Sequence, residues 1–292
     1  MEYNSVLPKI SVIVPVYNHW HLIPNLLNCL EKQSLNVEKF EILLIDNGSS
    51  NVPNIGALPS NVKFLQCMKP GSYAARNMGV NHAKGELLAF TDADCQPTSD
   101  WLTNALARYK ENGMMLISGG VQIIPVDWTN MTVSEMHEVA LGIPQESYAK
   151  KGYGATANLF IPRVLFEKYG LFDEKRFSGG DGEFCRRVAR SGIVLLYCRD
   201  ALVNHPARRE WHELVAKKCR IKGGQLTVGT KKQRLTWIFR TLVPPVYRWK
   251  KIFLSSKLLT SQKFLVCWVE VKLWLVEMGE MLRLFIGYKP RR

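Results

Sequence analysis

Runs of hydrophobic residues alternate with amphipathic helical patterns along the first third of the chain. Ile10–Val16 is β-branched and almost continuously apolar, as expected for a strand that is covered on both faces. The next segment, His19–Gln33, repeats its apolar residues at helical spacing. Further elements are predicted as strands at Glu41–Ile45, Val62–Gln66 and Leu87–Thr91 and as a helix at Ser72–Ala83. Such alternation indicates right-handed crossovers, so we predict an α/β fold with a mostly parallel central sheet flanked by helices.

The pattern is less regular after Asp94. Strands are predicted at Met114–Ile124, Thr156–Ile161 and Ile193–Tyr197, and helices at Trp101–Tyr109, Val164–Tyr169 and Glu183–Arg190. Residues 126–153 show no pattern that distinguishes a helix from a strand. Beyond Lys231 the patterns are long and helical, with a break at Pro244–Pro245. We therefore predict a first domain over residues 1–230 and a helical, basic extension over residues 231–292.

The net charge of +14 is concentrated in the last part of the chain. Residues 1–205 carry 19 basic and 20 acidic residues, whereas residues 206–292 carry 20 basic and 5 acidic ones. This basic region predicts an anionic partner. The aromatic residues Trp237, Tyr247 and Trp249 lie among the basic ones, so a nucleic-acid-binding protein is an alternative. The near-neutral body makes nucleic acid the less favoured partner.

Cysteine usage and the first residues bear on the compartment. Seven cysteines are scattered without a Cys-x-x-Cys pair, which argues against a disulfide framework or a zinc site and favours a reducing environment. The first residues lack a basic segment followed by a long apolar run, so we expect no secretory signal and a cytoplasmic location.

The most informative chemical feature is Asp92-Ala93-Asp94, directly after the apolar run Leu87–Thr91. Two carboxylates at the end of a buried strand repel each other unless a cation lies beside them. Mg²⁺ and Mn²⁺ take oxygen ligands and commonly bridge carboxylates to a diphosphate. Because ligands of open α/β sheets bind beyond the carboxyl ends of the strands, the pair predicts a metal–diphosphate site. A solvated turn with two surface aspartates is the alternative.

Other polar residues also fall near predicted strand ends. Asp46 ends the second strand and is a candidate for hydrogen bonds to a nucleotide, or simply a turn residue. Gly71 opens a helix whose free N–H groups favour an anion, and Arg76 adds a cation suited to phosphate. Asp181 follows a glycine pair at a helix start, where it is a candidate base or an N-cap. His205 is a candidate metal ligand or a structural hydrogen-bonding residue.

The order of these motifs closely resembles that of inverting glycosyltransferases of family 2, which have the GT-A type fold. The resemblance spans about residues 9–225 through Pro15-Val16-Tyr17-Asn18, Asp46-Asn47-Gly48-Ser49, Gly71 to Asn77, Asp92-Ala93-Asp94, Gly180-Asp181-Gly182-Glu183 and His205. It implies an enzyme that moves a sugar from a nucleotide-sugar donor, expected to be a UDP-sugar, to a hydroxyl acceptor with the help of Mn²⁺ or Mg²⁺. An inactive, transferase-like scaffold is the alternative to an enzyme.

The resemblance also implies a role for each residue of the donor site. Asp46 would contact the nucleotide base, Arg76 would lie near the nucleotide, and Asp92 would hold the ribose or the sugar. The remaining donor-site candidates are Pro15, Tyr17 and Gly71.

The metal and the base are implied in the same way. Asp94 would bind the metal, with His205 as a further ligand, and Asp181 would be the catalytic base. The chain departs from the family pattern at Asn47, where a second Asp is frequent, and at Gly180, where Glu often precedes the base. The Gln-x-x-Arg-Trp signature of processive synthases is absent from the corresponding residues 217–224, which favours transfer of a single sugar.

Near the C-terminus, apolar residues between Phe264 and Ile286 form a wide helical stripe that is interrupted by several charged residues. Those charges disfavour a membrane-spanning helix. A helix that lies on an anionic membrane surface fits better, and it would suit a lipid-linked or cell-envelope acceptor and a peripheral location on the cytoplasmic face. A helix that packs on the catalytic body or dimerises is the alternative.

Overall fold

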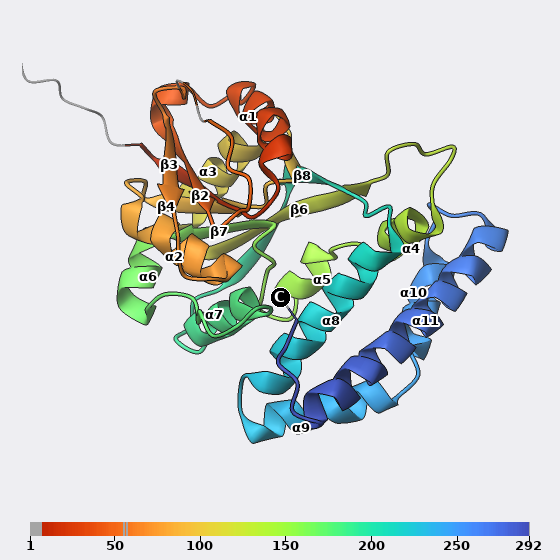
Figure 1. The fold of residues 1–292 in the computed structure, drawn as a ribbon. Helices are drawn as coiled ribbons and strands as arrows, with labels where there is room; N and C mark the ends of the chain where they lie inside the picture. Colours follow the sequence, from red (N-terminus) through yellow and green to blue (C-terminus); the bar gives the residue numbers. More distant parts are fainter. Residues whose placement is uncertain (1–7, 55, 57, 292) are drawn as a thin grey trace, which may run out of the picture. The chain divides into compact units, whose positions relative to one another are not determined.

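The computed structural model describes residues 8–54, 56 and 58–291 (Figure 1). The chain forms two compact units, which are described separately. The first comprises the residues up to Gln122, Pro144–Glu174 and Gly180–His205, and the second comprises Ile123–Ile143, Lys175–Gly179 and the residues from Pro206 onward. The second unit holds more than the predicted extension, and the domain boundary at residue 230 stays a prediction.

The first unit is built on an eight-stranded sheet with the order β3-β2-β1-β4-β7-β6-β8-β5. In its first half β1 pairs in parallel with β2 and β4, and β2 pairs in parallel with β3. The four strands are β1 (Ile10–Val16), β2 (Phe40–Asp46), β3 (Val62–Gln66) and β4 (Leu87–Thr91). All four strands were predicted from the sequence, β3 and β4 with these bounds.

The antiparallel pairs lie in the second half of the sheet. There β7 pairs with β4 and β6, and β5 pairs with β8. The four strands are β5 (Gln96–Pro97), β6 (Leu116–Ile124), β7 (Asn158–Pro162) and β8 (Leu195–Pro206). The predicted α/β fold, a central sheet flanked by helices, is confirmed, with parallel pairing among β1 to β4 and antiparallel pairing of β7 with β4 and β6 and of β5 with β8.

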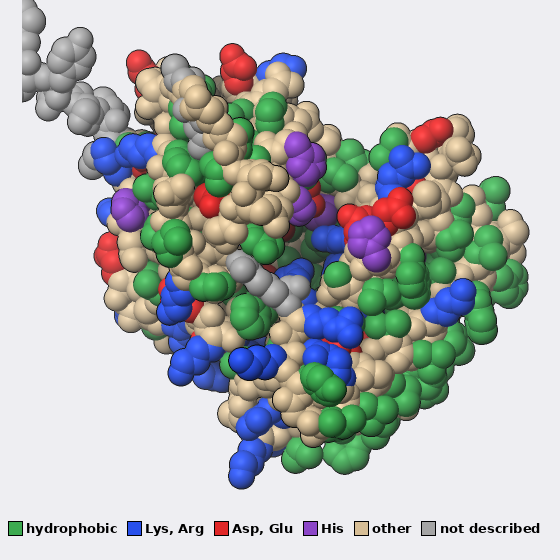
Figure 2. Space-filling model, in the orientation of Figure 1, with side chains coloured by type: hydrophobic (Ala, Val, Ile, Leu, Met, Phe, Trp, Pro, Cys, Tyr) green, Lys and Arg blue, Asp and Glu red, His purple; other side chains and the backbone are tan. Residues whose placement is uncertain are grey.

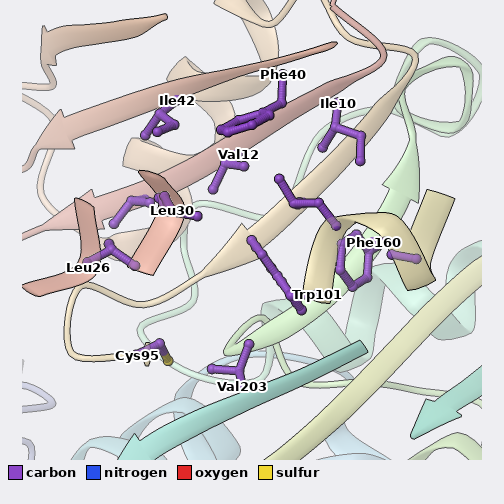
Figure 3. Close-up of a cluster of buried hydrophobic side chains, with 14 of the residues drawn as sticks. Ile10, Val12, Leu26, Leu30, Phe40, Ile42, Cys95, Trp101, Phe160 and Val203 are labelled. Carbon is purple, nitrogen blue, oxygen red and sulfur yellow. The ribbon is translucent and has the colours of Figure 1, made fainter. Parts of the chain in front are cut away.

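Both faces of the sheet are buried, which explains why the central strands are apolar at almost every position. Successive side chains of a strand point to opposite faces. Residues such as Ile10, Val12 and Ile42 pack with helices α1 (Ile23–Glu31) and α3 (Trp101–Asn112) in one cluster (Figure 3). The alternate residues, such as Ile13 and Leu43, form a second cluster with helices α2 (Ser72–His82), α6 (Arg163–Tyr169) and α7 (Gly180–Ala189).

Residues 126–153, which the apolar pattern left undecided, contain the helices α4 (Val133–Leu141) and α5 (Gln145–Ala149). The start of α4 is fixed by a capping box, in which Thr132 accepts from the N–H of Glu135 and the Glu135 side chain accepts from the N–H of Thr132. The Thr-x-x-Glu spacing is a sequence signal that would have located this helix.

The second unit consists mainly of helices. With α4 it contains α8 (Trp211–Thr227), α9 (Lys231–Leu242), α10 (Val246–Leu254) and α11 (Thr260–Phe285). The predicted break at Pro244–Pro245 separates α9 from α10, as expected for residues that cannot continue a helix. Among the described residues, no helix combines the length and the apolar character needed to cross a bilayer.

A buried ionic network joins α11 to its neighbours in this unit. The carboxylate of Glu270, which is 0% exposed, accepts from His137 of α4 at 2.6 Å and pairs with Lys218 of α8 and Arg248 of α10. Glu277 pairs with Lys218 at 2.9 Å. Although burial opposes ionisation, the His137 hydrogen bond and the two cations lower the pKa of Glu270 to about 2. The same balance between burial and nearby cations lowers the pKa of Glu277 to about 2.

This network predicts that the second unit loses stability in acid. Because the folded-state pKa of Glu270 lies below its unfolded value, its stabilisation is complete above pH 4.5 and disappears as the pH falls toward 2. A pKa shift of this size corresponds to about 3 kcal/mol of folding free energy for one carboxylate. The contribution of Glu277 is smaller, because Glu270 and Glu277 share Lys218 and their effects are not additive. The protection factors of the α11 amides, which correct hydrogen exchange for its intrinsic pH dependence, measure the effect between pH 6 and pH 3.

Glu270→Gln is the diagnostic variant and Glu111→Gln, at an exposed position, is the matched control. The α11 amides of Glu270→Gln should be less protected at pH 6, because Glu277 alone then neutralises Lys218 and Arg248, and their protection should depend less on pH. A pH dependence equal to that of the wild type would show that Glu270 is not its source.

Candidate active site

The ends of the parallel strands meet at one edge of the sheet. Val16, the last residue of β1, lies beside Asp46, the last residue of β2, and Asp46 lies beside Gln66, the last residue of β3. β4 ends at Thr91, one residue before the Asp92-Ala93-Asp94 motif. Three of the sequence motifs are therefore presented at the carboxyl ends of neighbouring strands, where α/β folds bind ligands.

Asp46 is buried, with 3% of its surface exposed, and both oxygens of its carboxylate accept hydrogen bonds. One oxygen accepts from the indole N–H of Trp20 at 2.9 Å, and the other accepts from the N–H groups of Gly48 and Ser49 at 3.0 and 3.2 Å. Burial alone would raise the pKa of Asp46, but the hydrogen bonds from Ser49, Trp20 and Gly48 outweigh it and lower the pKa. Asp46 therefore holds the turn after β2, and its contact with a nucleotide base stays a prediction.

Trp20 was expected only as an apolar residue of a helix. It lies in a short 3-10 helix, Trp20–Leu22, that precedes α1, and its ring nitrogen points to Asp46. Nearby, the Asn18 side chain accepts from the N–H of Ser50 at 2.9 Å and ties the loop after β1 to the loop after β2. Pro15 lies half-buried in β1, and Tyr17 follows it with 43% of its surface exposed.

Asn47, the first departure from the family pattern, has a structural reason. Its side-chain N–H₂ group donates to the carbonyls of Cys67 and Lys69 at 3.2 and 2.8 Å, and its oxygen accepts from the N–H of Gly71 at 2.8 Å. An aspartate would place a carboxylate against two carbonyls and could not donate to either. Asn47 thus fixes the loop that leads to Gly71, whose φ of 121° suits a glycine at the start of α2.

Arg76 and Asp92 form an ion pair at the edge of the sheet. The guanidinium is buried, donates to Asp92 at 2.6 Å and lies 5.5 Å from the centre of the Tyr73 ring. Its Nε has no hydrogen-bond partner among the described residues. A buried cation with an unused donor fits an anionic ligand at this position, because burial without a partner is costly.

Asp94, Cys95 and His205 form a cluster in which one ligand atom of each residue lies within 4.8 Å of the others. The antiparallel pairing of β5 with β8, which places Gln96 opposite Asn204, brings His205 to this point. His205 is buried, and its Nε2 lies 3.7 Å from the Asp94 carboxylate. The two predicted metal ligands are therefore adjacent in the structure although they are far apart in the sequence.

Cys95 was not predicted as part of this cluster, although it directly follows Asp94. Burial, together with the charges of Asp94 and Asp92, raises the pKa of the Cys95 thiol well above its usual range. A neutral thiol is a poor ligand for a hard divalent ion, whereas a carboxylate and an imidazole suit Mn²⁺. The donor set thus fits a divalent metal held by Asp94 and His205.

Asp181 is held next to the same strand ends. α7 begins at Gly180, so Asp181 lies in its first turn, and its carboxylate accepts from the N–H of Thr156 at 3.2 Å and of Gly182 at 2.7 Å. The residue after Thr156, Ala157, accepts through its carbonyl from the Thr91 hydroxyl at 3.1 Å. A two-residue segment thus links the candidate base to the end of β4.

Gly180, the second departure from the family pattern, lies against an aromatic ring. A Cβ atom at this position would come within 2.8 to 2.9 Å of three ring carbons of Tyr73, which is closer than real Cβ contacts. Tyr73, a residue of α2, is buried and its ring lies 5.6 Å from that of Phe172, so it has little room to move. The space that an acidic side chain would need at position 180 is filled by Tyr73.

Gly180→Ala is therefore expected to destabilise the protein by about 1–3 kcal/mol through overpacking against Tyr73. Gly279→Ala is the matched control, because nothing lies within 4 Å of a Cβ at that helical position. This control should stabilise the protein by up to about 1 kcal/mol, as alanine does in a helix. Urea unfolding of the three proteins measures the difference, and equal stabilities of the two variants would exclude the packing explanation.

Comparison with known proteins shows the family of the chain. Residues 11–170 match the Glycosyl transferase family 2. The chain is 33% identical over 232 residues to Glycosyltransferase AglE of Haloferax volcanii, which covers 77% of this chain and 75% of AglE. It is 24% identical over 212 residues to the amylovoran biosynthesis glycosyltransferase AmsB of Erwinia amylovora, covering 67% of this chain and 68% of AmsB. The chain therefore belongs to glycosyltransferase family 2 and is a glycosyltransferase.

A solved structure supports the fold. The mannosyltransferase PcManGT from Pyrobaculum calidifontis, in complex with GDP-Man and Mn²⁺, matches with a TM-score of 0.57 and 17% sequence identity. The match covers 97% of this chain and 76% of that one. At this identity the likeness shows the fold alone, which is the GT-A type fold that the motifs predicted.

Proposed function

We propose that this glycosyltransferase is metal-dependent and inverting, and that it transfers a single sugar from a UDP-sugar to a hydroxyl acceptor. The observation that carries the proposal is the grouping of Asp94, His205 and the Arg76–Asp92 pair at the strand ends, with Asp181 tied to the same edge through Thr156. A divalent ion would neutralise the carboxylate of Asp94, and the phosphates of a nucleotide sugar would accept a hydrogen bond from the Nε of Arg76. The complex of PcManGT with GDP-Man and Mn²⁺ is consistent with a nucleotide-sugar donor and a divalent metal.

The mechanism follows from the residues. Asp94 and His205 would hold the divalent ion, which would supply Lewis-acid stabilisation of the leaving nucleoside diphosphate. Arg76 would add a fixed positive charge near the phosphates. Asp181 would accept the proton of the acceptor hydroxyl while its oxygen attacks the anomeric carbon opposite the diphosphate. The new glycosidic bond forms as the bond to the diphosphate breaks, so the configuration of the anomeric carbon is inverted.

We also propose that the acceptor is a lipid-linked or cell-envelope glycan and that the protein is peripheral on the cytoplasmic face of a membrane. The basic second unit supports this location, because anionic lipids attract clustered lysine and arginine side chains.

The test is a thermal-shift screen of UDP, GDP and their sugar conjugates, each with and without Mn²⁺. We expect UDP-sugars with Mn²⁺ to raise the Tm, because a ligand that binds only the folded state stabilises it. Uridine with Mn²⁺, which lacks the diphosphate, is the control and should give a much smaller shift. A protein that responds to no nucleotide diphosphate would refute the proposed donor site, and a response to GDP alone would refute only the choice of UDP.

The anomeric configuration of the product, measured by NMR, tests inversion.

A further inference from the structure

Helix α11 buries its carboxylates together with Val266, Val269, Leu273 and Met281, and leaves a second set of apolar side chains in solvent. All three of its carboxylates are turned inward: Glu270 and Glu280 are at most 3% exposed, and Glu277 lies in the ionic network. The opposite side, called here the outer face of α11, carries four exposed apolar residues at helical spacing, namely Phe264, Trp268, Leu275 and Leu282, and Ile286 continues it directly after the helix. A surface helix usually turns its charged side chains, and not a row of large apolar ones, to solvent.

The exposed apolar surface continues beyond α11. The ring of Phe253 in α10 lies 5.4 Å from the ring of Phe264, so the two helices share one patch. Figure 2 shows hydrophobic side chains gathered over α11. Other exposed apolar residues of α9 and α10 and of the turns that follow them are Leu235, Phe239, Leu242, Val243, Val246, Tyr247, Leu254 and Leu259. Apolar patches of this extent mark an interaction surface, since soluble monomers rarely leave them in water.

The exposed charges on α9, α10 and α11 have one sign. Glu270, Glu277 and Glu280 are the only acidic residues after Glu213, and all three are held by cations inside the unit. Lys272 remains exposed on α11, with its ammonium 5.7 Å from the centre of the Trp268 ring. Further exposed basic residues are Lys231, Lys232, Arg240, Lys250, Lys257 and Lys289. The three helices that carry the patch are therefore apolar and cationic on their exposed sides, with no exposed carboxylate among the described residues after Glu213.

We propose that the outer face of α11 docks on an anionic lipid monolayer. The apolar side chains would enter the boundary between headgroups and acyl chains, while the surrounding lysines and arginines bind lipid phosphates. A second copy of the chain fits less well, because it would bring two cationic surfaces together without a carboxylate to pair them. This surface makes no use of the donor site, so docking and glycosyl transfer can be tested, and can fail, separately.

The experiment measures co-sedimentation of the full chain with vesicles of phosphatidylcholine, with or without an equal part of phosphatidylglycerol. Binding is expected only to the anionic vesicles and should weaken in high salt. Trp268→Glu should reduce the partition coefficient by about tenfold or more, because it places a carboxylate where an apolar side chain inserts. Lys272→Glu should reduce it by about fivefold or more through the lost attraction to phosphate.

Met114→Glu is the matched control, because Met114 is an exposed apolar residue of the first unit, and it should bind vesicles like the wild type. Quenching of tryptophan fluorescence by brominated lipid, taken as the difference between the wild type and Trp268→Phe, reports insertion without disrupting the surface. Failure to bind anionic vesicles, or equal binding to both vesicle types, would overturn the proposal. A dimer that Trp268→Glu dissociates in light scattering, without vesicle binding, would assign the face to a second copy instead.

Discussion

Replacing Asp181 with asparagine is expected to reduce kcat by about 10²- to 10⁴-fold while the affinity for the nucleotide sugar changes little. The amide keeps the size of the side chain, and its oxygen can still accept from the N–H of Thr156. It cannot take a proton from the acceptor hydroxyl. The loss should therefore appear in turnover, measured with saturating donor and acceptor, and not in the Kd of the donor, measured by calorimetry with Mn²⁺.

Glu183→Gln is the matched control, since Glu183 lies two residues further along α7 and pairs with Arg187 at 3.0 Å. It removes one negative charge from the same helix and should retain most of the turnover. Wild-type turnover by Asp181→Asn would exclude Asp181 as the base. A loss of equal size in both variants would point to the charge of the helix start and not to proton transfer at residue 181.

Local sequence was sufficient for β1 to β4. The bounds of β3 and β4 were predicted to the residue. The other half of the sheet was less predictable. β8 runs to Pro206, beyond the predicted end at Tyr197, and β5 has only two residues. β5 and β8 lie about a hundred residues apart in the sequence, so the apolar pattern of neither segment predicts that they pair.

In the candidate site, too, the residues could be predicted from the sequence but their contacts with distant segments could not. The order of the motifs gave the family and the candidate residues, but not the contacts that hold them. The Trp20 indole on Asp46 and the Tyr73 ring on Gly180 join segments that only the fold brings together. The proximity of His205 to Asp94 likewise depends on the pairing of β5 with β8.

The orientation of α11 could not be predicted from its pattern either. The spacing from Phe264 to Ile286 identified an amphipathic helix, and the usual rule would bury its apolar stripe. The side that is buried combines Val266, Val269, Leu273 and Met281 with carboxylates. Those carboxylates can be buried because Lys218, Lys222 and Arg248 of other helices neutralise two of them, and the pattern of α11 alone does not record these ion pairs.

The second large effect is expected for the metal site. Asp94→Asn removes the negative charge that would bind the divalent ion but leaves the shape of the side chain and its place beside His205. We expect kcat/KM for the donor to fall by about 10²- to 10³-fold, because Lewis-acid stabilisation of a leaving diphosphate is worth several kcal/mol. The Mn²⁺ concentration for half-maximal activity should rise, and electron paramagnetic resonance should show more free Mn²⁺ in the presence of UDP.

Asp100→Asn is the control for Asp94→Asn, because Asp100 is an exposed aspartate six residues further along that accepts no side-chain capping bond at the start of α3. It should keep the Mn²⁺ affinity and the donor affinity of the wild type. His205→Ala should resemble Asp94→Asn in its need for more Mn²⁺, since both would remove one ligand of the same ion. An Asp94→Asn enzyme with wild-type affinity for Mn²⁺ and UDP would show that the cluster of Asp94, Cys95 and His205 has a structural role and that the ion, if one is used, binds elsewhere.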